Sequence, residues 1–544
     1  MAIDKEPGGD TMRTLFSSAA GRILLSGSLG CAMTVLDTNV VGIILPTIAR
    51  ELGASFTDIE WVVSAYVLCF AALLLPAGSV ADRYGRKRIF LCGIAAFALA
   101  SLACALAPSA QALYVARAAQ GISAALLLAP ALAIIGHAFH DEAERTHAWA
   151  VWGGIMGLAM VLSPLAGGAI NALLGWRWAF AINIPICLLL GVAVLRHIPE
   201  SRNPSVRPLD LPGILSFSSA IFMLTWALIT GPERGWGSVV FAVRAAGGVF
   251  LFASFIALQR KGAHPMLDLS LFRSAGFIGA VAAMFAYAAS AQVMASLLPL
   301  FLQNARGMQA GAAGLAMLPF ALAMLLLPQI GRRLARTWPA ARILMLGLCT
   351  VALGNLFMAL AAHTGSGALT MIGMAVLGSG GGLLNGETQK AIMGNVPRER
   401  AGMASGISTT SRFTGVLAGF TGLGAVLAEG ARQAMARALA TLGTNGTNGT
   451  NGNNGANGAH ASEFIARAMA GDFGGAAQLY PQQREAAVAI ARRAYGLGFS
   501  HVFTAAALLA LCAAGIVAWS VRRAALPAPA TSAAAAPIRR TPRS

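Results

Sequence analysis

Apolar stretches of about 20 residues recur from one end of this 544-residue chain to the other, and they constrain its fold more than any other feature. A helix rises 1.5 Å per residue, so about 20 apolar residues cross the hydrocarbon core of a bilayer. A membrane β-barrel would instead show segments of about 10 residues with alternating polarity. The sequence therefore predicts an all-α polytopic membrane protein.

Length and hydropathy predict about fourteen spans. The first eight lie near residues 22–48, 59–81, 88–107, 111–138, 147–174, 177–196, 211–230 and 238–259. The last six lie near residues 275–302, 311–334, 341–362, 367–389, 403–428 and 499–521. Basic residues gather in every second connection and in both tails, as the positive-inside rule requires of cytoplasmic segments. We therefore expect a multi-pass protein of the inner membrane with both termini in the cytoplasm.

The net charge of +18 has the same explanation, because the basic residues lie where cytoplasmic loops require them. We therefore expect no nucleic-acid partner. With 57% hydrophobic and 11% charged residues, the chain has too little polar surface for a soluble protein of this length. The 7 cysteines and 8 histidines show no metal-ligand spacing, and no nucleotide-binding loop occurs. We expect no metal, no cofactor, no catalytic residues and no enzymatic activity.

The connection from 429 to 498 is predicted to be a long loop on the outer side. It contains the tract Thr444-Asn445-Gly446-Thr447-Asn448-Gly449-Thr450-Asn451-Gly452, whose composition cannot form a packed core. Residues 429–442 and 482–495, on either side, have a helical composition and are expected to form mobile helices.

Asp37 lies near the middle of the first apolar run. An acid at the centre of a bilayer costs about 2.5–3.5 kcal/mol on insertion scales, so such residues usually face a cavity or a charged partner. If water reaches it alternately from the two sides, its carboxyl can exchange protons with both. The alternative is that Asp37 only ties the first helix to a neighbour through hydrogen bonds.

The connection after the second span, residues 78–88, reads GSVADRYGRKR. We expect Gly78 to let its helix approach a neighbour closely and Gly85 to permit a tight turn. Asp82 can pair with nearby arginines such as Arg83 and Arg86, and this cluster could latch one conformational state. The alternative is simple anchoring of a basic loop. The pattern resembles the loop between helices 2 and 3 of the major facilitator superfamily.

Four more stretches resemble the fourteen-helix drug:proton antiporters of that superfamily. They are residues 36–46 (LDTNVVGIILP), 61–66 (WVVSAY), 175–185 (GWRWAFAINIP) and 265–272 (PMLDLSLF). The second stretch makes Trp61 and Tyr66 secondary site candidates. Gly42 stands where the helix 1 pattern has Asn, so one polar contact near Asp37 is expected to be absent.

Two motifs bear on the mechanism that the resemblance implies. Arg117-Ala118-Ala119-Gln120-Gly121 resembles the intramembrane arginine motif of helix 4, which is implicated in proton transfer, so Arg117 and Gln120 join Asp37 as candidates. At 1.5 Å per residue, Arg117 lies roughly 10 Å inside its helix, at a depth similar to that of Asp37. The alternative is that Arg117 extends to the membrane interface.

Residues 159–168 resemble the antiporter signature of helix 5, and here Pro164, Gly167 and Gly168 are the candidates. Ala159 and Ser163 replace glycines of the usual pattern, although small residues still permit close packing. Glu387 and Arg412 are notable charges in the second half, and Glu387 is expected to form a surface pair with Lys390 three residues later.

The resemblance implies a major facilitator fold. It divides the chain into a tail (1–21), a six-helix bundle (22–198), an inserted helix pair with linkers (199–272), a second six-helix bundle (273–521) and a basic tail (522–544). We expect proton-driven export of lipophilic cationic drugs, with the lipid bilayer, protons and the drug as partners; a periplasmic adaptor is left open. One alternative is an exporter of an endogenous anion, siderophore or self-made antibiotic, and another is a non-transporting receptor or scaffold.

Overall fold

A computed structural model of the chain describes residues 18–139, 141–202, 210–262, 267, 269–396, 401–445 and 454–525. Within this part of the chain, 14 helices are long and apolar enough to cross a membrane, which confirms the expected helical membrane fold. The two predicted tails lie mostly outside the described residues, as do residues 446–452 of the Asn/Gly tract and residues 265, 266 and 268 of the 265–272 stretch.

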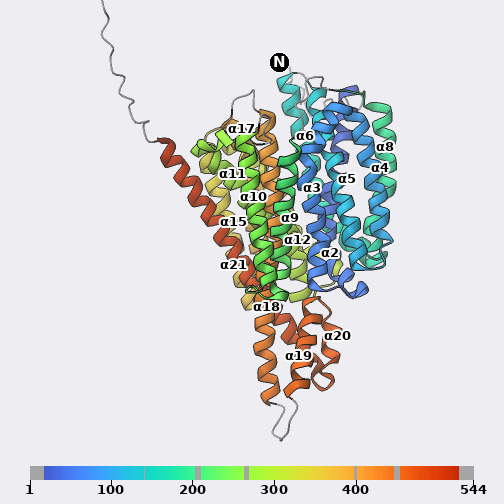
Figure 1. Cartoon of the computed structure of the whole chain (residues 1–544), viewed down its shortest axis with the longest axis vertical. Helices are drawn as coiled ribbons and strands as arrows, with labels where there is room; N and C mark the ends of the chain where they lie inside the picture. The colour runs from blue at the N-terminus through green and yellow to red at the C-terminus, as the bar shows by residue number, and fades with distance from the viewer. Residues whose placement is uncertain are drawn as a thin grey trace, which may run out of the picture.

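The first six spans form an N-terminal bundle (Figure 1). Its helices are Ala19–Leu52 (α2), Phe56–Tyr84 (α3), Arg86–Ala105 (α4), Ala110–Ala138 (α5) and Glu142–Leu173 (α6), followed by the broken span Arg177–Ala181 (α7) and Asn183–His197 (α8). Within the bundle, α5 packs along both α3 and α4, while α2 packs along α6. This arrangement places α5 between α3 and α4.

Two further helices, Leu211–Arg234 (α9) and Val239–Lys261 (α10), form an inserted hairpin. The C-terminal bundle then starts with Ala275–Tyr287 (α11), a π-helical segment Ala288–Gln292 (η2), Met294–Leu300 (α12) and a second π-helical segment Phe301–Ala305 (η3). Its remaining helices are Ala310–Ala316 (α13), Leu318–Leu334 (α14), Ala340–Thr364 (α15), Gly367–Leu384 (α16), Glu387–Gly394 (α17), Ala401–Asn445 (α18) and Arg484–Ala525 (α21). The hairpin contacts both bundles, because α9 packs against α3 and α18.

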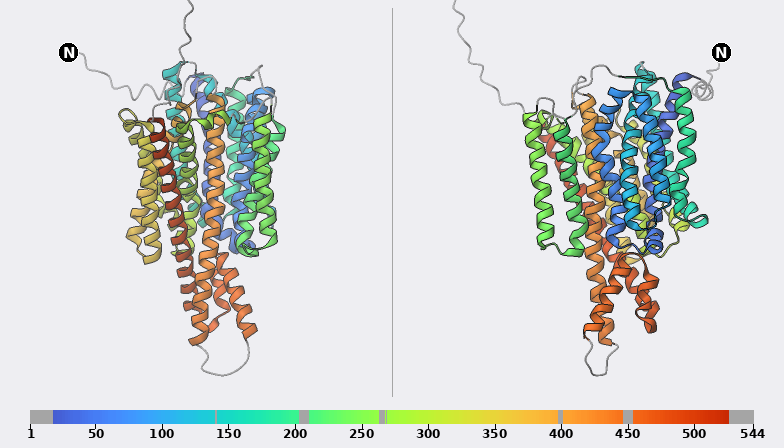
Figure 2. Two further views of the ribbon diagram at one scale, coloured as in Figure 1. Left: turned by 60° about the vertical axis from the view of Figure 1, so that its left-hand side comes forward. Right: turned by 45° about the vertical axis from the view of Figure 1, so that its right-hand side comes forward.

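The molecule has two distinct ends (Figure 2). We call one the basic end: it carries Arg86 after α3, Arg332 and Arg333 at the close of α14, and the start of α2. The opposite end, called the projecting end, carries Asn454–Met469 (α19) and Phe473–Gln478 (α20), which extend beyond the other helices. The last residues of α21 return to the basic end.

The helices expected at 429–442 and 482–495 are present as parts of α18 and α21, and α19 and α20 make much of the remaining 429–498 connection helical instead of a loop. Both α18 and α21 continue as unbroken helices past the level at which the other spans end, and α19 and α20 pack against them (Figure 1). Phe464, Tyr495 and Phe499 are buried in this extension, and they continue the hydrophobic core of the bundles. The Tyr495 hydroxyl donates to the Met469 carbonyl at 3.2 Å. Apolar side chains at helical spacing therefore order most of the segment outside the Asn/Gly tract.

Candidate functional site

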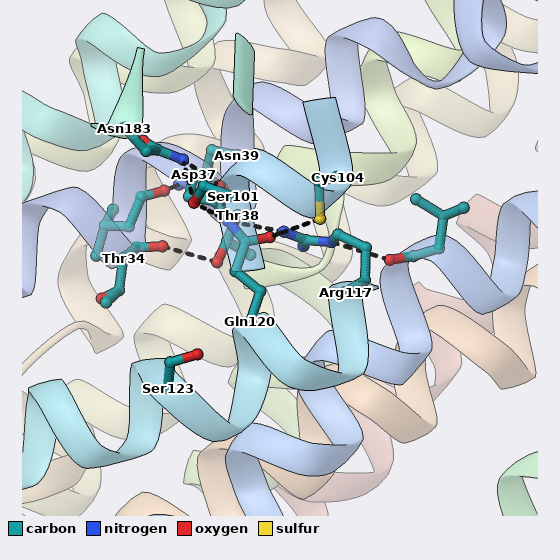
Figure 3. Close-up of polar contacts among 12 residues, drawn as sticks. Thr34, Asp37, Thr38, Asn39, Ser101, Cys104, Arg117, Gln120, Ser123 and Asn183 are labelled. Carbon is teal, nitrogen blue, oxygen red and sulfur yellow. Dashed lines mark hydrogen bonds and ion pairs between the residues drawn. The ribbon is translucent and has the colours of Figure 1, made fainter. Parts of the chain in front are cut away.

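Asp37 lies in a buried polar cluster inside the N-terminal bundle (Figure 3). Its carboxylate accepts three hydrogen bonds: from Arg117 Nη1 at 2.6 Å, from Gln120 Nε2 at 2.8 Å and from Asn183 Nδ2 at 2.8 Å. The donors come from α5 and α8, while Asp37 itself lies on α2. The predicted meeting of Asp37 and Arg117 thus occurs through direct contact. Since the Arg117 side chain is only 1% exposed, it does not extend to the interface.

Arg117 is held from several sides. Its Nε donates to the Val62 carbonyl of α3 at 3.2 Å, and its Nη1 also donates to Gln120 Oε1 at 2.7 Å. The guanidinium carbon lies 4.2 Å from the ring centroid of Tyr66, which is close enough for a cation–π interaction. The secondary candidate Tyr66 therefore belongs to this cluster. Its neighbour Trp61 does not, because its ring contacts Tyr114 and Phe222 instead.

The cluster extends to α4 through Gln120, whose Nε2 donates to Ser101 Oγ at 2.9 Å. Two charges removed from water are tolerated only when they are paired and hydrogen-bonded, and here both conditions are met. Protonation of Asp37 would remove one charge of the pair and leave Arg117 without a carboxylate. The cluster thus links α2, α4, α5 and α8 through one buried ion pair and its hydrogen bonds. It also ties α2 to α5 and α8, as the packing interpretation predicts.

Asn183 was not singled out from the sequence, although it lies in the GWRWAFAINIP stretch that carried the resemblance. The signal in the sequence was the polar amide side chain of Asn183 between two isoleucines of an apolar run. A second acid also went unnoticed: Glu60, directly before Trp61, is only 2% exposed and lies within the span Phe56–Leu74.

The charged connection between α3 and α4 is organised within the N-terminal bundle. Arg86 Nε donates to Asp82 Oδ1 at 2.8 Å, so the expected acid–arginine pair is present, while Arg83 is exposed beside Tyr84. Gly85 adopts a positive φ of 116°, which favours glycine and confirms the tight turn. Beyond the turn, the Glu200 carboxylate accepts from the Lys87 backbone N–H at 3.0 Å.

The prediction that Gly78 lets its helix, α3, approach a neighbouring helix closely is wrong. A Cβ at Gly78 would lie 3.9 Å from the nearest side-chain atom, which is ordinary contact. The close approach between α3 and α5 occurs at Gly121, where a Cβ would lie 2.3 Å from the carbonyl oxygen of Tyr66. This glycine lets the helix that carries Arg117 lie directly against α3.

Small residues of α6 and α2 bring the two bundles together in the half nearer the projecting end. A Cβ at Gly168 would lie 2.8 Å from the Ala310 carbonyl oxygen of α13, and α6 continues through Pro164 without a break. Gly167 packs on α2, where its Cβ would lie 3.3 Å from Val40. Gly42 has the same role on α2: a Cβ there would lie 2.9 Å from Ser296 Cα. The residue expected only to lack a polar contact therefore permits contact between the bundles.

Glu387 and Arg412 occupy different surroundings in the C-terminal bundle. Lys390 Nζ lies 2.6 Å from Glu387 Oε1, which is the predicted pair, but Glu387 is buried rather than on the surface. Arg412 Nε donates to Gln292 Oε1 at 2.8 Å, at the end of the π-helical segment η2. Neither residue contacts the Asp37 cluster in the described part of the chain.

Fourteen apolar spans, two bundles that meet through small residues and a buried ion pair characterise a multi-pass membrane protein. The comparisons with known proteins give the family. The sequence model of the family described as "Major Facilitator Superfamily" matches residues 27–420, and the chain belongs to this superfamily. The expected family and fold are thereby confirmed.

The relatives in this superfamily include drug and antibiotic exporters. The chain is 37% identical over 406 residues to the "Multidrug resistance protein Stp" of Mycobacterium tuberculosis, covering 74% of this chain and 75% of that protein. It is 30% identical to the "Multidrug efflux pump LfrA" of Mycolicibacterium smegmatis over 91% of this chain and 95% of that one. Among solved structures, a bacterial homologue of the lysosomal transporter Spinster, inward-facing and occupied, aligns with a TM-score of 0.63 at 17% identity, covering 92% of this chain and 96% of that one.

Proposed function

We propose that this transporter exports lipophilic cationic compounds across the inner membrane in exchange for protons. The observation that carries the proposal is the buried Asp37–Arg117 pair, in which one carboxylate accepts from three donors on two other helices. Burial and pairing make the charge of Asp37 depend on which neighbours and which waters surround it. The names of the relatives support drug export as the transported class.

In this proposal the basic end faces the cytoplasm, in agreement with the positive-inside rule, and both termini lie there. The two bundles rock about a central site. A cationic substrate entering from the cytoplasm displaces the Asp37 proton, and reprotonation from outside releases the substrate. Exchange of one monovalent cation for one proton moves no net charge. Each additional proton would add about 2.3 kcal/mol per 100 mV of membrane potential, and no other cofactor is needed.

Everted membrane vesicles test the proposal directly. Wild-type vesicles should accumulate a fluorescent lipophilic cation when a pH gradient is imposed, and added substrate should dissipate that gradient. Asp37→Asn should lose both responses while the protein still inserts in the membrane. Glu463→Gln is the matched control, because Glu463 forms an ion pair with Arg467 at the same 2.6 Å but on the exposed extension. Full gradient-driven uptake by Asp37→Asn would refute the proposal.

Arg412 favours a second candidate function, the export of anionic compounds. Among the described residues no carboxylate pairs with it, and the buried hydroxyl of Tyr287, which has no hydrogen-bond partner there, lies within its electrostatic range. The adjacent Phe413 touches Phe70 of the N-terminal bundle, with ring centroids 4.3 Å apart, so Arg412 lies close to the boundary between the bundles. An arginine in this position could bind a substrate carboxylate.

Competition separates the two candidates. If the substrate is cationic, lipophilic carboxylates should not inhibit uptake, and Arg412→Gln should retain the wild-type half-inhibition values for cations. If the substrate is anionic, carboxylates should inhibit transport by the wild type, and Arg412→Gln should weaken this inhibition by about tenfold or more.

A further inference from the structure

Glu60 is a further buried acid within the membrane-spanning part of the molecule, and it lies at the junction of three helices. It lies on α3, in the half nearer the projecting end, and only 2% of its surface is exposed. Its carboxylate lies against Gly424 of α18, where an added Cβ would be 1.9 Å from Oε1. The inserted helix α9 packs against both α3 and α18 and so flanks this junction.

The carboxyl of Glu60 differs from that of Asp37 in having no hydrogen-bond donor. Neither of its oxygens has a partner among the described residues, whereas Asp37 accepts three hydrogen bonds. An ionised carboxylate removed from water without donors is strongly disfavoured, and the neutral acid is the form that such a site can hold. The arrangement therefore fits a protonated side chain.

The charged surroundings do not replace the missing donors. The titratable or charged side chains that lie within electrostatic range of Glu60 are Glu233 of α9, Arg432 of α18 and Tyr495 of α21. Arg432 donates to the Pro232 carbonyl, and the Tyr495 hydroxyl donates to the Met469 carbonyl. Glu429 and His501 lie further along α18 and α21, where they line a surface pocket with Trp236. In this structure none of these groups hydrogen-bonds to Glu60.

The junction lies between the two bundles, so it changes when they separate. Phe70 and Phe413 mark a second contact between α3 and α18, ten residues from Glu60 along α3 and eleven from Gly424 along α18. At 1.5 Å per residue the two contacts are about 15 Å apart on antiparallel helices. Separation of the bundles at the projecting end would remove Gly424 from Glu60 and admit water to the carboxyl.

We propose that Glu60 is a proton-binding site that controls the contact between the bundles at the projecting end. With a proton bound, the neutral acid packs on Gly424 and the bundles stay together. When the carboxyl loses that proton to water at this end, the carboxylate requires solvation, which favours separation. The proton returns from the same side when the bundles close, so this exchange moves no proton across the membrane. The inference rests on the proposed alternation between two states but not on proton-driven export.

Distance measurements on the purified protein test this inference. Nitroxide labels are attached to cysteines introduced at Thr57 of α3 and Gln433 of α18, after replacement of the seven native cysteines, and the protein is placed in lipid nanodiscs. In the wild type, raising the pH from about 5 to about 9 should shift the distance distribution to longer values. Glu60→Gln should lose this shift and keep the short distance throughout.

Two controls make the outcome specific. Glu463→Gln removes an exposed acid from the same end of the molecule and should leave the shift unchanged. Glu60→Met, which removes the carboxyl but keeps a side chain of similar length, gives the same test if the glutamine variant does not fold. A complete pH-dependent shift in the Glu60 variants would overturn the inference while leaving proton-driven export standing. Loss of the shift in them would support it even if transport proved independent of a pH gradient.

Discussion

The strongest test of the Asp37 cluster is to remove its two charges separately and together. Asp37→Asn leaves the buried guanidinium of Arg117 without a carboxylate, and Arg117→Met leaves the carboxylate with only the Gln120 and Asn183 amides. Breaking a buried ion pair by removing one partner costs about 3–5 kcal/mol. Each single variant should therefore lose stability of this order.

The double variant should be more stable than the sum of the single effects predicts, because it leaves no unpaired charge. We expect the two substitutions to couple by about 2 kcal/mol or more. The measurement is reversible unfolding in mixed micelles with increasing denaturing detergent. The Glu463–Arg467 pair is the matched control: its atoms are also 2.6 Å apart, but both side chains are more than 40% exposed. Its coupling should be only about 0.3–0.5 kcal/mol.

Transport by the same proteins then separates a structural role from a role in proton exchange. If Asp37 only ties helices together, the double variant should regain transport as it regains stability. If Asp37 exchanges the proton, the double variant should remain inactive despite its recovered stability. Additive single effects, with coupling no larger than in the exposed control pair, would refute the account of the cluster as an energetically linked ion pair.

Two further predictions concern helix packing. Gly121→Ala should destabilise the protein by about 1–3 kcal/mol, because its Cβ would lie 2.3 Å from the backbone oxygen of Tyr66. Gly154→Ala is the control and should be neutral or slightly stabilising, because a Cβ there would have no atom within 4 Å. Equal melting temperatures for the two variants would contradict this account. Gly42→Ala should leave folding intact but favour separation of the bundles near Ser296, measured as increased labelling of a cysteine introduced at position 296, and unchanged labelling would show that this contact does not control closure.

The sequence alone determined the class of fold and most of its spans. A helix needs a minimum length of apolar sequence to cross a bilayer, so each membrane span can be identified from the hydropathy of consecutive residues. The intramembrane acid at Asp37 and the arginine at Arg117 were visible for the same reason: each interrupts an apolar run where charge is costly. Helices on either side of the Asn/Gly tract were expected from composition, but their packing was not: the helices around the tract bury Phe464 and Phe499.

Only the tertiary structure decided which of these groups meet. Asn183 is 146 residues from Asp37 in the chain, yet its amide donates to the same carboxylate as Arg117. The tertiary structure also showed that the close helix contact lies at Gly121 and not at Gly78, and that the buried Glu60 has no hydrogen-bond donor among the described residues. Such contacts depend on the rotation and tilt of each helix, which are set by the packing of all its neighbours together. A pattern along one helix records depth in the membrane, but it does not record the partner on the next helix.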